Sequence, residues 1–127
     1  MGVSYLASTV DGQPYNRAMM LIHHREKFYY ATFVGDKKVD QLVKNPHVAV
    51  CVPIGKENSE GSIRLRGKVE FIVDPDVRSI VHGCAGFIQG FWEDPQHPEF
   101  TLLEFKPEIL EYMKPGSMET VRLEFQV

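Results

Sequence analysis

The sequence predicts a mainly β protein, a closed antiparallel barrel that carries one or two short helices. Roughly eight short segments rich in β-forming residues follow one another along the 127-residue chain. Most connections between these segments are too short for the crossovers of a parallel sheet. One segment has a clear helical spacing of apolar residues. The length fits a single domain that spans residues 1–127.

The first part of the chain is expected to form three strands in an antiparallel meander. Asp11-Gly12 is typical of a tight turn, and the polar run Arg25-Glu26-Lys27 separates the second strand from the third. The second strand is apolar on both faces, which predicts that both faces are covered. The expected strands are Tyr5–Val10, Arg17–His23 and Phe28–Val34.

A short helix is expected after these strands. Apolar residues recur three and four positions apart between residues 37 and 44, which indicates one face of a helix. Asp36 is a suitable N-cap. Asn45-Pro46 ends the helix, because the residue before a proline avoids the helical conformation.

The middle of the chain is expected to form two more strands. The apolar segment His47–Pro53 is the first, and the polar residues 55–61 form a loop after it. In the second strand, apolar and charged residues alternate from Ile63 to Val73, which is typical of a strand with one solvent-exposed face. Gly67 interrupts the apolar series and indicates a bend or bulge.

The last part of the chain is expected to return to strands after an ambiguous segment. Residues 76–91 have helical spacing of apolar residues, but their glycines argue against one long helix. Lys106-Pro107 and Pro115-Gly116 are expected to form turns. The expected strands are Phe100–Phe105, Ile109–Met113 and Glu119–Phe125.

The composition argues against several classes of protein. A net charge of −3 gives no general attraction to nucleic acid or to an anionic membrane. No stretch approaches the roughly 18 apolar residues of a transmembrane helix.

Cys51 and Cys84 lie far apart, which argues against a disulfide framework or a zinc site. Adjacent His23 and His24 would point to opposite faces of a strand. We therefore expect a cytoplasmic protein without a metal.

Three basic residues suggest a site for an anion. Arg17 begins the second strand, whereas Lys37 and Lys38 begin the helix, and in a meander these positions can be neighbours. A helix N-terminus offers free N–H groups and partial positive charge. An arginine adds a planar fork that matches phosphate oxygens. This pattern predicts a phosphate site, with solvated surface charge as the alternative interpretation.

A planar ligand is a further hypothesis. The aromatic residues between Phe28 and Phe33, with Met19 and Met20 on the neighbouring strand, offer a flat and polarizable surface. An ordinary barrel core would have the same composition, so this alternative stays open.

Several short motifs follow one another in an order that resembles a known family. They are Tyr5-Leu6-Ala7-Ser8-Thr9, Asp11-Gly12-Gln13-Pro14, Arg17-Ala18-Met19-Met20, Phe28-Tyr29-Tyr30-Ala31-Thr32-Phe33, Gly35-Asp36-Lys37-Lys38, Asn45-Pro46-His47-Val48-Ala49 and Ile63-Arg64-Leu65-Arg66-Gly67-Lys68-Val69. The order and spacing resemble the pyridoxamine 5′-phosphate oxidase-like family of FMN-binding split barrels. Within that family the chain is most similar to the small nitroimidazole-resistance-like and general-stress-like members.

The resemblance implies a six-stranded split barrel that forms a homodimer, with two FMN sites between the subunits. The implied cofactor-binding residues are Arg17, Lys37 and Lys38 for the phosphate, and Ala18, Met19, Met20, Ala31, Thr32 and Ser62 for the flavin ring. Phe91 and Trp92 would cap the flavin from the partner subunit or lie in the core of the dimer interface. The redox chemistry would then come from the cofactor, and the protein would position it.

Two departures from the family pattern bear on function. Ile22 stands where the oxidase has a substrate-binding lysine, which argues against pyridoxamine phosphate as the substrate. Asp36 stands where a serine is common, and its carboxylate would use N–H groups that a phosphate needs. We expect an FMN-dependent oxidoreductase that acts on an unidentified small molecule. The alternatives are a flavin- or deazaflavin-binding relative with little catalysis, and a non-enzymatic barrel that binds an apolar ligand.

Overall fold

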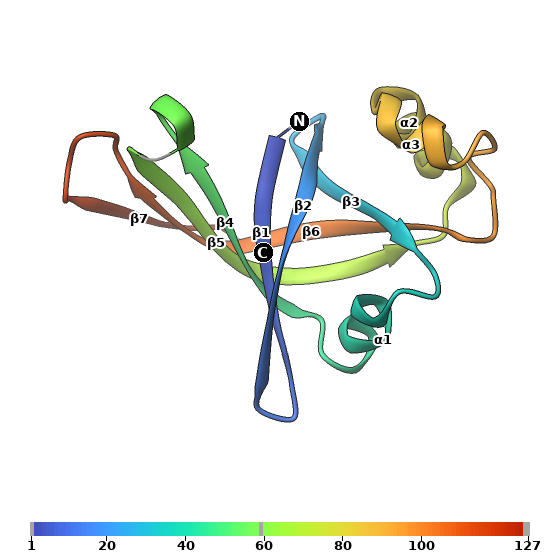
Figure 1. Cartoon of the computed structure of the whole chain (residues 1–127), viewed down its shortest axis with the longest axis horizontal. Helices are drawn as coiled ribbons and strands as arrows, with labels where there is room; N and C mark the ends of the chain where they lie inside the picture. The colour runs from blue at the N-terminus through green and yellow to red at the C-terminus, as the bar shows by residue number, and fades with distance from the viewer. Residues whose placement is uncertain (1, 59, 126–127) are drawn as a thin grey trace.

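The fold is a closed antiparallel barrel of six strands to which a seventh strand is added (Figure 1). The structure is a computed structural model that describes residues 2–58 and 60–125. The sheet order is β3-β2-β1-β4-β5-β6-β7, and a further pairing of β3 with β6 closes the barrel. The strands are β1 (Gly2–Val10), β2 (Gln13–His24), β3 (Lys27–Phe33), β4 (His47–Ile54), β5 (Gly61–Ile72), β6 (Phe100–Met113) and β7 (Thr120–Glu124). This confirms the expected fold class.

Three short α-helices lie in the described part of the chain, where one or two were expected. They are α1 (Lys37–Lys44), α2 (Pro75–Cys84) and α3 (Gly86–Phe91), and a 3-10 turn, η1 (Lys56–Asn58), lies in the loop before β5. The prediction for residues 37–44 is confirmed, and Asp36 is the N-cap of α1. The ambiguous segment forms two helices because Ala85 has an extended backbone between them. Every helix among the described residues falls short of the length and hydropathy that a membrane span requires.

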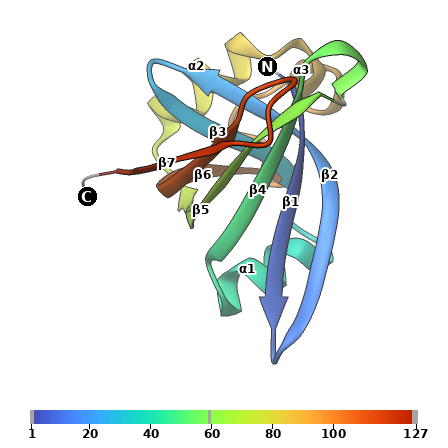
Figure 2. The same cartoon turned by 90° about the vertical axis from the view of Figure 1, so that its left-hand side faces the viewer.

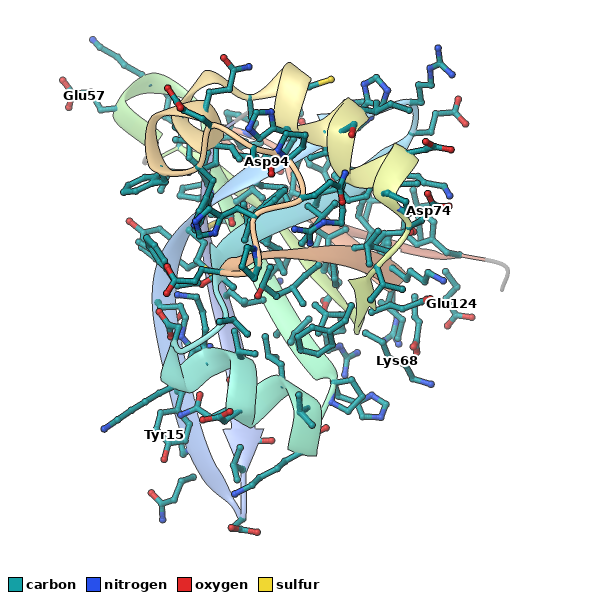
Figure 3. All side chains as sticks on the ribbon, turned by 90° about the vertical axis from the view of Figure 1, so that its right-hand side faces the viewer. Tyr15, Glu57, Lys68, Asp74, Asp94 and Glu124 are labelled. Atoms are coloured by element: carbon teal, nitrogen blue, oxygen red, sulfur yellow. The ribbon has the colours of Figure 1, made fainter. Side chains whose placement is uncertain are left out.

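The barrel encloses one core, and the helices α2 and α3 create a second core outside it. The inner core contains Leu6, Tyr30, Leu42, Val48, Val50, Leu65, Val69, Leu103 and Phe105. The outer core lies between the sheet and the two helices and contains Ile22, Tyr29, Val81, Ala85, Ile88, Trp92, Phe100 and Leu102. Figure 3, viewed from the side of the helices, shows α2 and α3 above and α1 below. Strand β7 lies on the opposite side of the molecule (Figure 1).

The second strand is covered on both faces at one end only. Ile22 lies in the outer core and is 2% exposed, whereas Met20 on the same face is 37% exposed. The expectation that both faces are covered is therefore wrong for the half of β2 that α2 and α3 do not reach. Figure 2 shows this half as part of a long β1–β2 hairpin that extends past α1.

The strand β6 runs through the position where a turn was expected. Lys106 and Pro107 lie inside β6, so Phe100–Phe105 and Ile109–Met113 form one strand and not two. Gly67 is paired with Pro107, and the register with β5 shifts at this point. The bulge predicted at Gly67 is thus confirmed, and its extra residue is Glu108 of β6, which has no partner in β5. Pro107 lies next to this extra residue, and bulges are among the places where a sheet tolerates a proline.

Candidate functional site

A cavity of about 260 Å³ opens on the outer face of β2 and β3, between the start of α1 and helix α3. It contains six of the predicted site residues, Ala18, Met19, Met20, Ala31, Thr32 and Lys38. Five further residues line it, namely Phe33, Asp36, Phe87, Phe91 and Trp92. The structure therefore brings most of the predicted flavin-contacting segments to one place.

The floor of this cavity is apolar and made of small or flexible side chains. Side chains alternate along a strand, so Ala18 and Met20 share the outer face with Ile22, which packs against the helices. Ala31 is on the outer face of β3, next to the residues that support α3. The two alanines leave space above the sheet that larger residues would fill.

An aromatic wall closes one side of the cavity. The ring of Phe33 is 4.7 Å from that of Trp92 and meets Phe91 edge-on at 5.6 Å. Trp92 is nearly buried and stacks on Phe100 at 5.2 Å, whereas Phe91 is 63% exposed at the rim. Phe91 and Trp92 were expected either to cap a flavin from the partner subunit or to lie in the core of a dimer interface. Within one chain, both residues line this cavity.

The sequence analysis missed the contribution of Phe87 because it left residues 76–91 without a structure. Phe87 and Phe91 are four residues apart, a spacing that places them on one face of α3. Among the residues between Phe28 and Phe33, Tyr29 and Tyr30 belong to the two cores. For these two tyrosines the alternative interpretation, an ordinary core, is the correct one.

The polar end of the cavity is formed by Asp36 and Lys38. The Asp36 carboxylate accepts a hydrogen bond from the backbone N–H of Lys38 at 2.9 Å, and its second oxygen is 2.9 Å from Lys38 Nζ. Burial raises the pKa of Asp36, but the hydrogen bonds and charge of Lys38, together with the charge of Arg17, outweigh it. The pKa therefore lies below its ordinary value. Asp36 is thus held as an anion.

Arg17 lies close to α1 but on the other face of β2. It is paired in register with Leu6, a residue of the inner core. Its guanidinium donates to Ser8 Oγ at 3.2 Å and to Gln41 Oε1 at 2.8 Å. Burial lowers the pKa of Arg17, and the charge of Asp36 acts in the opposite direction. The structure therefore places Arg17 close to α1 and half-buried, outside the residues that line the cavity.

Two other predicted residues also lie outside the cavity. Lys37 is exposed at the first position of α1. Ser62 is near the start of β5, where it pairs with Pro53 and Met113. The sheet order places β1 and β4 between this strand and β2. Within one chain, the fold does not bring Ser62 to the flavin-contacting segments.

Two further hollows lie on the outer face of the sheet, over β1, β4 and β5. Their volumes are about 390 and 260 Å³, and Ala7, Ala49 and Arg66 line both. Neither has an aromatic wall. We place the candidate site in the cavity beside α3 because six of the predicted site residues line it, together with an apolar floor, an aromatic wall and a basic side chain.

The histidines and cysteines form no metal site in the part of the chain that the structure describes. His82 is buried, and its Nε2 lies 2.7 Å from the carbonyl oxygen of Trp92. Cys84 is exposed and lies 3.3 Å from His24 Nδ1. His82 therefore has a structural role, since it ties α2 to the end of α3.

The barrel with its open cavity defines a split-barrel protein, and a comparison with known families gives its family. The family model described as pyridoxamine 5′-phosphate oxidase matches residues 3–114. The chain belongs to the pyridoxamine 5′-phosphate oxidase family, which confirms the resemblance of its motifs.

Individual relatives match this chain in sequence or in structure. The pyridoxine/pyridoxamine 5′-phosphate oxidase of Escherichia coli is 32% identical over 80 residues, which are 61% of this chain and 36% of the relative. The chain thus spans about a third of the curated relatives that it matches. General Stress Protein 26 from Bacillus anthracis has a TM-score of 0.75 at 23% identity, covering 96% of this chain and 89% of its own.

Two other similar structures are named for the ligands that those proteins bind, and the two ligands differ. A FAD-binding protein from Mesorhizobium loti has a TM-score of 0.71 at 20% identity, covering 87% of this chain and 83% of its own. A heme-binding protein from Mycobacterium smegmatis has a TM-score of 0.79 at 11% identity, covering 97% of this chain and 52% of its own. These likenesses show the shared fold. They do not identify a ligand of this chain, for which the residues of the cavity are the guide.

Proposed function

We propose that this protein binds FMN in the cavity beside α3 and acts as a flavin-dependent oxidoreductase on a small molecule. The observation that carries the proposal is the cavity itself. It joins an apolar floor and an aromatic wall to a basic side chain at the start of a helix. A flavin has the matching parts, a planar ring system and an anionic tail, and membership of the family supports the same ligand.

The phosphate would lie at the start of α1. Lys38 lines the cavity there, and the N-terminus of the helix adds partial positive charge. Lys37 is exposed next to it and would need to turn toward the ligand. Arg17 would act through its charge from below the helix, where Ser8 and Gln41 hold it.

The flavin supplies the electron or hydride transfer, and the chain supplies position and environment. Trp92 and Phe33 are well placed to exclude water from one face of a bound ring. Among the described residues that line the cavity, Asp36 and Lys38 are the titratable ones, and both lie at its polar end. The apolar end offers no side chain for proton transfer, so a substrate there would react with the flavin directly.

The lining of the cavity favours a flavin over a heme. Heme iron in proteins is commonly held by histidine, cysteine or tyrosine, or by a methionine that acts together with a histidine. Among the described residues, no histidine, cysteine or tyrosine lines the cavity, so Met19 and Met20 have no histidine there to complete such a pair.

The proposed assembly is a homodimer with the cofactor at the interface. Val3, Tyr5 and Met20 lie on one outer face next to the cavity and are 48%, 42% and 37% exposed. A second subunit on this face would cover these side chains and the open rim. In such a dimer, Ser62 of one subunit would contact the flavin in the cavity of the other. Sedimentation equilibrium tests the assembly, and a monomer at all concentrations would contradict it.

The binding proposal is tested by titrating the purified protein with FMN and following the quenching of flavin fluorescence. Lys38→Gln is expected to weaken binding at least tenfold, because a hydrogen bond to a charged group contributes about 1.5–3 kcal/mol. Lys44→Gln is the matched control, since Lys44 is exposed in the last turn of the same helix. The double variant Arg17→Ala Lys38→Ala is expected to abolish binding.

Several outcomes would decide against the proposal. A colourless protein that fails to bind added FMN would contradict it, and binding of a deazaflavin instead would favour a different cofactor. Equal affinities of the Lys38→Gln and Lys44→Gln variants would remove the phosphate from the start of α1. For the reaction, the reduced flavoprotein is mixed with a panel of small organic acceptors under anaerobic conditions. Failure of every acceptor to reoxidise the flavin would favour a binding protein over an enzyme.

A further inference from the structure

The polar end of the cavity already holds an anion that belongs to the chain. The two oxygens of Asp36 are engaged by the backbone N–H and by the ammonium group of Lys38, each at 2.9 Å. Both residues line the cavity, and the Lys38 side chain is 16% exposed. A helix N-terminal amide and a lysine ammonium are the donors that a phosphate would use. Here the same donors are paired with a carboxylate.

The neighbouring basic residues do not offer a second set of donors inside the cavity. Arg17 directs its guanidinium to Ser8 and Gln41 on the other side of β2. Lys37 is exposed outside the cavity lining. An anionic group that enters the cavity therefore meets Lys38, and Lys38 already holds Asp36.

We propose that Asp36 is a specificity-determining residue that competes with the phosphate of the flavin for Lys38. It thereby reduces the preference of the site for FMN over riboflavin. This inference rests on the proposed function, because it assumes that the cavity binds a flavin. It concerns the tail of the ligand and leaves the contacts with the ring unchanged.

The competition has a simple electrostatic origin. A phosphate can bind while Asp36 stays in place, and two anions then share one ammonium group. Alternatively Asp36 turns away, and α1 loses the hydrogen bond at its N-cap. Both routes cost free energy for FMN. The neutral tail of riboflavin requires neither, so its affinity does not depend on the charge of residue 36.

The test compares FMN and riboflavin on the wild-type protein and on two variants. Asp36→Asn removes the negative charge but keeps an oxygen that can cap the helix. Asp40→Asn is the matched control, because Asp40 lies in the first turn of the same helix but is exposed and does not line the cavity. Dissociation constants come from quenching of flavin fluorescence, and circular dichroism confirms that each variant is folded. Asp36→Ser, a second N-capping residue, replaces Asp36→Asn if the latter does not fold.

Asp36→Asn is expected to bind FMN at least tenfold more tightly than the wild type, which corresponds to about 1.4 kcal/mol. Its affinity for riboflavin should stay within about twofold, and Asp40→Asn should change the affinity for FMN less than about threefold. An unchanged ratio of the FMN and riboflavin affinities, or weaker FMN binding, would overturn the inference while the proposed function stands. Equal tightening of both ligands, or equal tightening by Asp40→Asn, would overturn it as well. If none of the proteins binds either flavin, the proposed function itself fails.

Discussion

An alanine at Gly67 would place a methyl group against the backbone of β6. A Cβ atom built on this residue overlaps the carbonyl oxygen of Lys106 and lies 2.9 Å from the Cα atom of Pro107. These obstacles are main-chain atoms of the neighbouring strand, so a change of side-chain rotamer cannot relieve the overlap. The two strands would have to separate at the bulge, where β5 and β6 pair.

We expect Gly67→Ala to destabilise the protein by about 3 kcal/mol. Overpacking typically costs about 1–3 kcal/mol, and the upper end applies because the backbone must move. The hydrophobic residues on both sides of the bulge, Leu65 and Val69, belong to the inner core and would shift with the strand. A loss of this size lowers the melting temperature of a domain of this length by about 10 °C.

Urea denaturation of the purified variant measures this effect, with circular dichroism as one probe and fluorescence as a second. The fluorescence comes from Trp92, which lies in the outer core. Gly83→Ala is the control, because no heavy atom would lie within 4 Å of its Cβ and the residue is exposed in α2. Alanine favours a helix over glycine by up to about 1 kcal/mol, so this variant should be slightly more stable than the wild type.

The reasoning would be refuted if Gly67→Ala unfolded within about 0.5 kcal/mol of the wild-type protein. Such a result would mean that β5 and β6 are not as close at the bulge as the structure places them. A loss of stability for Gly83→Ala equal to that of Gly67→Ala would show that the extra methyl group acts by some route other than the overlap.

Two further predictions concern the rim of the cavity and the inner core. Phe91→Ala should weaken FMN binding about two- to tenfold, because an aromatic contact contributes about 0.5–1.5 kcal/mol. The melting temperature should stay the same, since Phe91 is 63% exposed. Fluorescence titration measures the affinity and calorimetry the melting temperature. An unchanged affinity would mean that the flavin ring does not lie against Phe91. Burial raises the pKa of Tyr30 from 10.0 to about 12, against the opposing effect of its hydrogen bond with Ser4. The folded protein therefore keeps this proton at pH values where the unfolded chain loses it, and stability should fall by about 2 kcal/mol between pH 10 and pH 12. Urea denaturation across this range should show a correspondingly smaller loss for Tyr30→Phe, and an equal loss in both proteins would mean that Tyr30 is not the group responsible.

Local patterns in the sequence were sufficient for the elements that depend on neighbouring residues. The turn at Asp11-Gly12, with φ values of 52° and 78°, follows from the residues that tolerate a left-handed backbone. The helix over residues 37–44 follows from its apolar spacing and from Asp36. The bulge at Gly67 follows from a glycine within an alternating strand. Each signal lies within a few residues of the feature that it predicts.

The same patterns were insufficient where distant segments decide the outcome. Lys106-Pro107 has the composition of a turn, but pairing with β5 keeps it inside a strand. Residues 75–91 gain their helices by packing on the outer face of β2, β3 and β6, which no local window contains.

For the candidate site, the sequence by itself determined the kinds of residue present, an apolar strand segment and basic residues at the start of a helix. The tertiary structure decided which of them meet. It placed Arg17 on the inner side of β2 and brought Phe91 and Trp92 to the cavity of their own chain. It left Ser62 on a strand that two others separate from β2, and at the opposite end of β6 from the residues that pair with Ala31 and Thr32. The reason is that a side chain's type is local, whereas its neighbours depend on strand register and on which face another element covers. Both are properties of contacts between residues far apart in the chain.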